Sequence, residues 1–438
     1  MENTQTAPVA EQSRISIIDT LRGIALLGIL MMNIPYFGNP YQYHFNINVL
    51  QEFSGPNYWC WYLVNLFFEG TMRGIFSMLF GAGALLLLDR LEKNPPPGLN
   101  PADIYYRRLL WLLLFGLFNA FILLWAGDIL YTYAIVGLVL FPFRKVKASR
   151  LLILGIVCML LSTWQNSSKL WHAQETRKDG EAAKSLVSKH KKLTDSQKED
   201  LEAWEKYQKK HSLANVRMEA THELKKSSQS YPEIFSEMAE VNVYIETKDF
   251  YGEYFFDALS FFFIGMALFR LGFLTGVQSL NVYWITMLLG YGIGLTINYF
   301  NLRTFIITGF DFSLYADYYP FSIYQFKRIF LALGHISLVI LLYRYQIGNF
   351  LWRWLGNVGR MAFSNYLMQS IFGALFFHGY GLGYFGKLQR YELYEYVLCV
   401  WIFQLIFSQI WLHYFRFGPL EWVWRSLTYW KKQPFLRP

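Results

Sequence analysis

Residues 19–33 read Asp19-Thr-Leu-Arg22-Gly-Ile-Ala-Leu-Leu-Gly-Ile-Leu-Met-Met-Asn33. An acid and an arginine open an apolar run, and an amide lies deeper within it. At 100° per residue, Arg22 and Asn33 fall within about 20° of one another around a helix, and Asp19 flanks the same stripe. Polar groups inside a membrane are costly and usually face the interior of a helix bundle. The stretch therefore predicts a first membrane helix whose polar face is turned toward other helices.

The composition is that of an integral membrane protein. Hydrophobic residues make up 54% of the chain and aromatic residues 19%, whereas charged residues make up only 16%. Apolar runs of about 18 residues or more recur, which is the length that a helix needs to cross the hydrocarbon core of a bilayer. The net charge of +9 fits orientation signals at the ends of these runs. Membrane lipids are therefore expected partners, and nucleic acid is not.

Ten apolar segments predict an all-α fold, a polytopic transmembrane helix bundle. The second segment is long for a single crossing, and a bend at Glu69-Gly70 would divide it into an interfacial piece and a spanning piece. The fourth and fifth segments are short. The ten segments cover residues 15–36, 58–88, 105–125, 128–143, 150–165, 252–273, 281–300, 322–343, 360–377 and 396–415.

Loops rich in lysine and arginine alternate along the chain with loops that contain few of them, as the positive-inside rule requires. Residues 89–108 and 144–150 are basic, whereas residues 37–57 contain neither Lys nor Arg. The alternation holds for ten spans with both termini in the cytoplasm. It divides the chain into a cytoplasmic tail (1–14), a first transmembrane half of five spans (15–165), an extracytoplasmic charged insertion (166–250), a second half of five spans (251–415) and a cytoplasmic interfacial tail (416–438).

The insertion is rich in Lys and Glu. Thr194 with Gln197 has the spacing of a capping box that starts a helix, and Leu201 and Trp204 supply a thin apolar face after it. We expect helices that lie outside, over the membrane domain. The low apolar content is also compatible with partial disorder.

Two acidic positions lie toward the outer side. Glu69 and Arg73 are four residues apart, so on one helix they would share a face and pair; the pair is either structural or binds and activates a polar substrate. Asp128 begins the fourth segment. It would serve as a helix N-cap, or as a base or acceptor-binding carboxylate assisted by Tyr133.

Polar residues of the eighth and ninth segments form a second group. Arg328 and His335 are seven residues apart and stack on one face; Arg328 would snorkel outward. His335 is expected either to hydrogen-bond between helices or to act as a base. Asn365 and Gln369 project together, either as interhelical hydrogen-bonding residues or as the lining of a polar channel.

By depth, these side chains outline a polar path across the membrane, if their helix faces converge. The cytoplasmic group also holds Glu421 and Arg425, again four residues apart. The cytoplasmic residues are Asp19, Arg22, Arg360, Glu421 and Arg425; the middle ones are His335, Asn365 and Gln369; the outer ones are Asn33, Glu69, Arg73 and Asp128.

Other signatures are weak or missing. His190-Lys-Lys-Leu-Thr-Asp195 fits a His-x4-Asp acyltransferase pattern, but it lies in the charged insertion and is attributed to chance. No Cys/His metal spacing, phosphate-binding loop, GxSxG or HExxH occurs, so neither a metal site nor a bound cofactor is expected. Gly290-x-x-x-Gly294 permits close helix contact, either within the chain or in a homodimer.

Several stretches resemble the YeiB-like family of bacterial membrane proteins, whose C-terminal half defines a domain of unknown function. Thr71 stands where the resemblance leads us to expect a lysine, and the insertion does not match. The matching stretches, in chain order, are residues 19–33, 69–83 (ending Leu-Phe-Gly-Ala-Gly), 127–130 (Gly-Asp-Ile-Leu), 265–273, 359–369 (Gly-Arg-Met-Ala-Phe-Ser-Asn-Tyr-Leu-Met-Gln) and 418–428.

This resemblance implies a location in the bacterial inner (plasma) membrane and a relationship to the transmembrane acyltransferase superfamily. That group includes heparan-alpha-glucosaminide N-acetyltransferase and bacterial sugar O-acyltransferases, which pass an acyl group from a cytoplasmic donor to an acceptor on the far side. Acyl-CoA is then the implied donor, and a sugar or lipid the implied acceptor. The glucosaminide enzymes use a His after an Asn on the first helix, and His44 has a comparable place after Asn33.

Three functions follow as hypotheses: acyl transfer, transport of a small solute or lipid, and a non-catalytic sensor or scaffold whose insertion binds a partner. Acyl transfer would place the donor near Arg22 and Arg360 and would use a general base. Broken helices would favour transport. The candidate catalytic residues are Asp128, His335, His44 and Glu69, and the candidate donor- and substrate-binding residues are Asp19, Arg22, Asn33, Arg73, Tyr133, Arg328, Arg360, Asn365, Gln369, Glu421 and Arg425.

Overall fold

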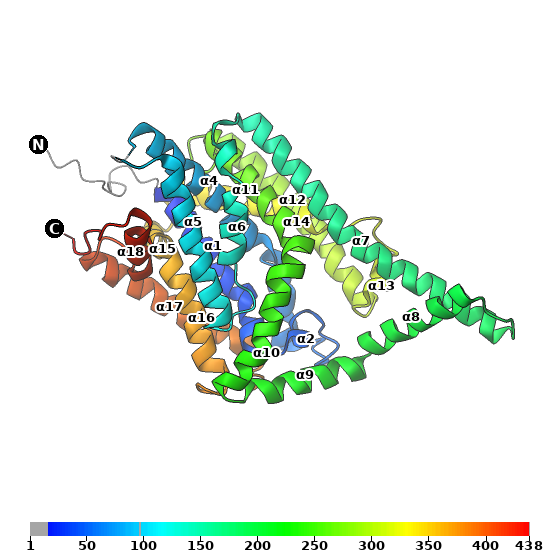
Figure 1. The fold of residues 1–438 in the computed structure, drawn as a ribbon. Coiled ribbons are helices and arrows are strands. Elements are labelled where there is room, and N and C mark those ends of the chain that lie inside the picture. The colour runs from blue at the N-terminus through cyan, green and yellow to red at the C-terminus, as the bar shows by residue number, and fades with distance from the viewer. Residues whose placement is uncertain (1–15, 96–97, 438) are drawn as a thin grey trace, which may run out of the picture.

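The computed structural model of the chain describes residues 16–95 and 98–437, and every named element in these ranges is a helix (Figure 1). The predicted all-α bundle is confirmed; the predicted tail, residues 1–14, lies outside the described residues. The elements are α1 (Ser16–Gly38), α2 (Tyr41–Phe45), α3 (Gly55–Phe67), α4 (Thr71–Lys93), α5 (Pro101–Phe121), α6 (Leu130–Leu138), η2 (Phe141–Lys145), α7 (Ala148–Ser188), α8 (Asp195–His211), α9 (Leu213–Ser227), α10 (Tyr231–Tyr244), η3 (Ile245–Tyr254), α11 (Phe255–Arg270), α12 (Leu280–Ile307), α13 (Phe312–Tyr315), α14 (Tyr324–Arg344), α15 (Asn349–Arg360), α16 (Ala362–Phe377), α17 (Arg390–Tyr414) and α18 (Pro419–Tyr429).

Helix α4 lies at the centre of the bundle, where it contacts α1, α11 and α14. The most apolar windows of α1 and of α3–α4 are both 67% buried, whereas those of α12 and α17 are only 22% and 28% buried. The outer helices expose large apolar side chains such as Leu288 and Leu398. This arrangement suits a protein whose outer helices face lipid hydrocarbon.

Seven helical segments of the described residues are long and apolar enough to cross a membrane, so the chain is a multi-pass membrane protein. The predicted fourth span is instead the nine-residue α6 followed by the 3₁₀ turn η2. At 1.5 Å per residue, nine residues reach only about 14 Å, less than half of the hydrocarbon thickness. The count of ten crossings therefore stays a prediction.

The predicted bend at Glu69-Gly70 is confirmed as a break between α3 and α4. Gly70 has a φ of 69°, in the left-handed region that glycine adopts at little steric cost. Glu69 lies in the break itself, outside both helices. As a result, Glu69 and Arg73 do not share a helix face.

Close helix packing depends on glycines. A side chain at Gly265 of α11 would overlap the backbone carbonyl of Met78 on α4. The predicted contact motif of α12 packs against α14, because Gly290 faces Gly334 and Gly294 faces Leu331. The motif is thus used within the chain, and a homodimer stays a prediction.

The insertion is helical, as expected, but no helix begins or ends at residue 166. Helix α7 runs unbroken for 41 residues from the bundle into the insertion. The predicted capping box is confirmed, since Gln197 N donates to Thr194 Oγ1 at 3.3 Å and Thr194 N donates to Gln197 Oε1 at 3.0 Å. Trp204 of α8 is buried against Gly180 of α7.

The insertion then returns to the bundle as α9 and α10, forming an arch along one side of it (Figure 1). Both carboxylate oxygens of Glu223 on α9 accept from the backbone N of Tyr41 in α2, at 3.2 and 3.3 Å. The hydroxyl of Tyr231 donates to the carbonyl of Ile122 at 2.8 Å, and Asn242 Nδ2 donates to the carbonyl of Ala120. We call the end of the bundle that contacts α9 and α10 the insertion side. The opposite end, where α1 begins and α17 ends, is the terminal side.

Gly265→Ala tests the α4–α11 contact. The added methyl group meets the fixed carbonyl of Met78, and overpacking of this kind costs about 1–3 kcal/mol. The thermal midpoint of the purified protein in detergent should fall. Gly292→Ala, where a Cβ meets nothing within 4 Å, is the control and should leave the midpoint unchanged or raise it. Equal midpoints for the two variants would contradict the packing.

Docking of α9 should depend on pH. Burial raises the pKa of Glu223 from 4.5 to about 7. Because the pKa is higher in the docked state, the stabilisation is complete below about pH 4.5 and is lost as the pH rises through 7. Amide hydrogen exchange of residues 213–227, corrected for intrinsic rates, should speed up toward pH 8. Glu223→Gln keeps an acceptor for Tyr41 N without the charge and should abolish this pH dependence, whereas the exposed Glu219→Gln should not. A wild-type profile in Glu223→Gln would refute the assignment.

Candidate functional site

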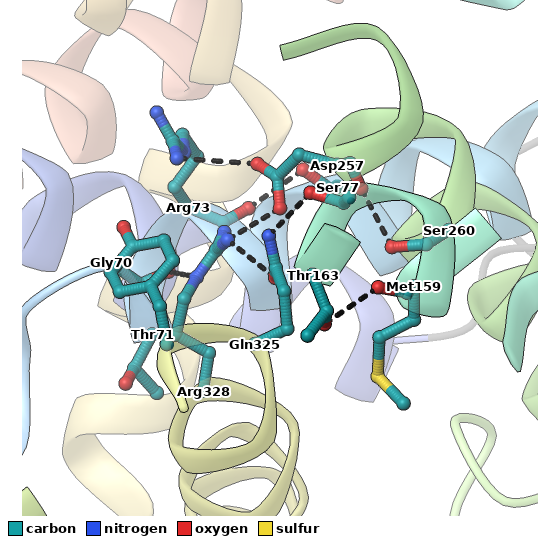
Figure 2. A network of polar contacts seen from close by, with 12 residues as sticks. Gly70, Thr71, Arg73, Ser77, Met159, Thr163, Asp257, Ser260, Gln325 and Arg328 are labelled. Atoms are coloured by element: carbon teal, nitrogen blue, oxygen red, sulfur yellow. Dashed lines mark hydrogen bonds and ion pairs between the residues drawn. The ribbon is translucent and has the colours of Figure 1, made fainter. Parts of the chain in front are cut away.

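Asp257 of α11 bridges two arginines in the bundle interior (Figure 2). Its Oδ1 accepts from Nη1 of Arg328 on α14 at 2.5 Å, and its Oδ2 accepts from Nη2 of Arg73 on α4 at 3.2 Å. Arg328 is fully buried. Its Nη1 also donates to Oε1 of Gln325 at 3.0 Å, and its Nε donates to the carbonyl of Gly70 at 2.9 Å. Arg328 thus holds the helix break against α11, and the expectation that it snorkels outward is wrong.

The predicted pairing of Glu69 with Arg73 is also wrong, because Glu69 lies in the break and pairs with Lys327, whereas Arg73 pairs with Asp257. Glu69 Oε2 accepts from Nζ of Lys327 at 2.5 Å. Lys327 also donates to Oδ1 of Asn298 on α12 at 3.1 Å. Lys327 therefore supplies a cation beside Glu69 in this chain, in which position 71 is Thr71.

A pocket of about 70 Å³ lies beside Arg73 and Asp257 on the insertion side. It brings together three of the predicted residues, Arg73, Asp128 and Tyr133, with Asp257, which was not predicted. One wall is η3, a ten-residue π-helix, and π-helical turns occur frequently at functional sites. We call it the insertion-side pocket; its polar lining is Arg73, Ser77, Asp128, Thr132, Tyr133, Tyr254 and Asp257.

Asp128 caps the start of α6, as predicted. Its Oδ2 accepts from the backbone N of Tyr131 at 2.8 Å. Its Oδ1 accepts from Nδ2 of Asn119 at 2.7 Å and lies 3.4 Å from the hydroxyl of Tyr366 on α16. Since Asp128 also lines the pocket, it is placed to meet a ligand; its role as a base stays a prediction.

Tyr133 is held in the pocket by α4. Its hydroxyl lies 2.6 Å from Oγ of Ser77, and both hydroxyls lie near the backbone carbonyl of Arg73, at 3.4 and 2.9 Å. Ser77 is one turn from Arg73 on the same helix. The pocket therefore presents a guanidinium and two hydroxyls from α4 and α6.

A second cavity, which we call the terminal cleft, has a volume of about 500 Å³ and lies on the terminal side. Its lining includes Asp19, Arg353, Arg360 and Arg437. Arg360 Nη1 donates to Oδ1 of Asn357 at 3.2 Å. Three arginines around one cleft suit a ligand with phosphate groups, which arginine recognises with paired hydrogen bonds.

Helix α16 lines neither cavity, but its polar side chains contact Asp128 of the insertion-side pocket and Ser408, which adjoins the terminal cleft. Asn365 Nδ2 donates to Oγ of Ser408 on α17 at 3.0 Å, and Gln369 Nε2 donates to Oε1 of Gln404 at 3.1 Å. Ser408 adjoins Gln409, which lines the terminal cleft. Oδ1 of Asn365 and Oε1 of Gln369 are buried without a hydrogen-bond partner among the described residues. Buried polar atoms of this kind commonly mark a site for water or a ligand.

Other predicted residues have local roles. Arg22 pairs with Asp19 at 2.9 Å, one turn away on α1. Glu421 accepts from the backbone N of Phe363 at 2.8 Å and of Ser364 at 3.1 Å, so it caps the start of α16. The Arg425 guanidinium lies 4.6 Å from the ring centroid of Phe417.

The candidate residues His335, His44 and Asn33 line neither the insertion-side pocket nor the terminal cleft. Both ring nitrogens of His335 are hydrogen-bonded, Nδ1 to the hydroxyl of Tyr291 at 2.7 Å and Nε2 to the carbonyl of Phe67 at 2.9 Å. This geometry favours the interhelical role. His44 stacks on Tyr36 with ring centroids 3.8 Å apart. Burial, with the nearby Arg390, lowers the pKa of His44 to about 3, so its imidazole is a weak base at neutral pH.

Asp257 and Lys327 are the two members of the buried charge network that the sequence analysis missed. Asp257 follows two phenylalanines at the start of an apolar segment and resembles an ordinary helix-start acid. Lys327 adjoins Arg328, and no local pattern sets it apart. One signal was available: an acid inside a membrane segment requires a cationic partner, and Asp257 had none nearby in sequence.

Comparison with known proteins finds a family model and full-length relatives that are similar to the chain. A model of a protein family of unknown function (DUF418) matches residues 268–431. The chain is 28% identical over 457 aligned residues to the uncharacterized protein YxaH of Bacillus subtilis (strain 168), covering 98% of each chain. It is 29% identical over 427 residues to the uncharacterized protein YeiB of Escherichia coli (strain K12), covering 94% of this chain and 95% of that one. The chain is similar to these two relatives over nearly its whole length. No solved structure matches it.

The expected YeiB-like resemblance is thereby confirmed. The matched region of this chain runs from the end of α11 through α18 and contains Lys327, Arg328 and the α14–α17 wall of the terminal cleft. Arg73, Asp128 and Asp257 precede it. Their link to the family rests on the two relatives, whose alignments span nearly the whole chain.

Asp257→Ala should destabilise the protein more than any loss of a surface acid. It leaves the fully buried Arg328 without its carboxylate, and breaking one partner of a buried ion pair costs about 3–5 kcal/mol. Unfolding of the purified protein by heat or SDS measures the loss, with the exposed Glu199→Ala as control. Adding Arg328→Met to Asp257→Ala should recover part of the stability; no recovery would argue against the bridge.

Proposed function

We propose that this membrane protein transfers acyl groups from a cytoplasmic donor to an acceptor on the opposite side of the membrane. The observation that supports this most is that one bundle holds a basic terminal cleft and a carboxylate-bearing insertion-side pocket, and that polar residues of α16 contact Asp128 of the pocket and Ser408 beside the cleft. An acyl-CoA donor would place its phosphates against Arg353 and Arg360. A sugar or lipid acceptor would approach from the insertion side and place one polar group in the pocket.

In the proposed step, the acceptor's O–H or N–H attacks the thioester carbonyl. The bond from the acceptor to the acyl carbon forms, the carbon–sulfur bond breaks, and CoA leaves as the thiol. Asp128 takes the acceptor's proton and returns it to the departing sulfur, directly or through water. Its contacts with Asn119, the Tyr131 N–H and Tyr366 fix the carboxylate for that role.

Acyl transfer is tested with labelled acyl-CoA and purified protein in nanodiscs. Asp128→Asn should lower turnover by about 10²–10⁴-fold, the usual contribution of a general base, and should leave donor binding unchanged. Arg360→Gln should instead weaken donor binding about 10-fold or more, the worth of a charge-assisted hydrogen bond. The control is Arg150→Gln, an exposed arginine at the start of α7. Absence of turnover with every acyl donor would reject the proposal.

Transport of a small anionic solute or lipid is the second candidate. The break between α3 and α4 supports it, because α4 begins beside the charged cluster of Arg73 and Asp257. Discontinuous helices of transporters direct their positive N-terminal ends at anionic substrate groups in the same way. Counterflow in proteoliposomes without donor consumption would favour this function over acyl transfer.

A further inference from the structure

The insertion-side pocket has a guanidinium that Asp257 uses only in part. An arginine carries five N–H donors, and a single described bond, from Nη2, links Arg73 to Asp257. Nε of Arg73 is buried and has no hydrogen-bond partner among the described residues. The side chain as a whole is 33% exposed, whereas that of Arg328 is 0% exposed. Arg73 is therefore the member of the bridge that a ligand can reach.

The charges around the Arg73–Asp257–Arg328 ion bridge do not cancel at the Arg73 end of the pocket. Asp257 offers one negative charge to two guanidiniums, and Glu69 is occupied by Lys327. The other acid of the lining, Asp128, already accepts from Asn119 and the Tyr131 N–H in the α5–α6 connection. The pocket thus has an excess of positive charge beside Arg73 and a carboxylate beside the α6 start.

Size restricts what can bind. A water molecule takes about 30 Å³ of liquid volume, so a pocket of about 70 Å³ accommodates a single small polar group and not a sugar ring. The hydroxyls of Ser77 and Tyr133 lie 2.6 Å apart, and both are directed at the Arg73 backbone carbonyl, at 2.9 and 3.4 Å. The donors left for a ligand are those of the Arg73 guanidinium. A small anionic group matches them, because guanidinium binds carboxylate and phosphate oxygens in pairs.

We propose that the Arg73 end of the insertion-side pocket is an anion subsite that binds a phosphate or carboxylate group. Resting on the proposed function, the group belongs to the acceptor, and it would place the acceptor's hydroxyl or amine toward Asp128. The anion is either part of a lipid headgroup or a free solute. Binding itself requires no donor and no turnover.

Calorimetry on the full chain in phosphatidylcholine nanodiscs, titrated with inorganic phosphate or acetate, tests the subsite. Saturable binding is expected for at least one of the two anions. Arg73→Gln should weaken it by at least 10-fold, and Arg73→Lys, which keeps the charge but lacks the paired donors, should weaken it less. The matched control is Arg303→Gln, an exposed arginine of α12 that lies outside the pocket, and it should bind as the wild type does.

A second arm identifies the source of the anion. Nanodiscs containing phosphatidic acid should compete with phosphate if a lipid headgroup occupies the subsite, and should not compete if the ligand is a free solute; either result supports the subsite. The subsite is refuted if Arg73→Gln binds phosphate and acetate as tightly as the wild type does. It is also refuted if the wild type binds neither anion saturably and does not selectively retain phosphatidic acid. Because Arg73→Lys keeps a cation for Asp257, it reports on the subsite even where Arg73→Gln fails to fold.

The two proposals can fail separately. Asp128→Asn should retain or strengthen phosphate binding while it abolishes acyl transfer. Arg73-dependent anion binding in a protein without acyl transfer would reject the enzyme and retain the subsite.

Discussion

A single carboxylate, that of Asp257, holds three helices of the bundle together. Charges removed from water are costly unless each has a partner and further hydrogen bonds. Asp257 supplies the anionic partner of Arg328 and Arg73 at once, while Gln325 and the Gly70 carbonyl accept from other N–H groups of Arg328. Because the Gly70 carbonyl lies at the helix break, the same ion bridge that joins α4, α11 and α14 also fixes where α4 begins.

The break has a chemical consequence for the pocket. A continuous helix through residue 70 would have kept Glu69 and Arg73 beside each other, neutralising both. Left-handed Gly70 separates them, so Glu69 turns to Lys327 and Arg73 lines the insertion-side pocket. The π-helical η3 lines the pocket from the facing side. Two departures from regular α-helix therefore border the same small cavity.

Much of this architecture follows from sequence pattern alone. Apolar run length predicts the membrane bundle, the Thr194 and Gln197 spacing predicts the start of α8, and the glycine spacing at 290 and 294 predicts a close helix contact. Three of the candidates that polar residues in apolar runs suggested, Arg73, Asp128 and Tyr133, line the insertion-side pocket, while their roles stay predictions. The partners of these residues do not follow, because an i to i+4 rule assumes an unbroken helix. Asp257 and Lys327 are distant in sequence from the groups that they neutralise, and no local pattern contains that information.

That distance also shapes how the protein is made. Arg73 precedes Asp257 by 184 residues, and Glu69 precedes Lys327 by 258. A ribosome delivers α4 to the bilayer long before either counter-charge has been synthesised. Until α11 and α14 are inserted, Glu69 and Arg73 lack these counter-charges, so a location near water or within the insertion machinery would cost less than one in hydrocarbon. A chain released before α14 would carry Glu69 without its lysine, and cellular quality control has a clear feature by which to recognise it.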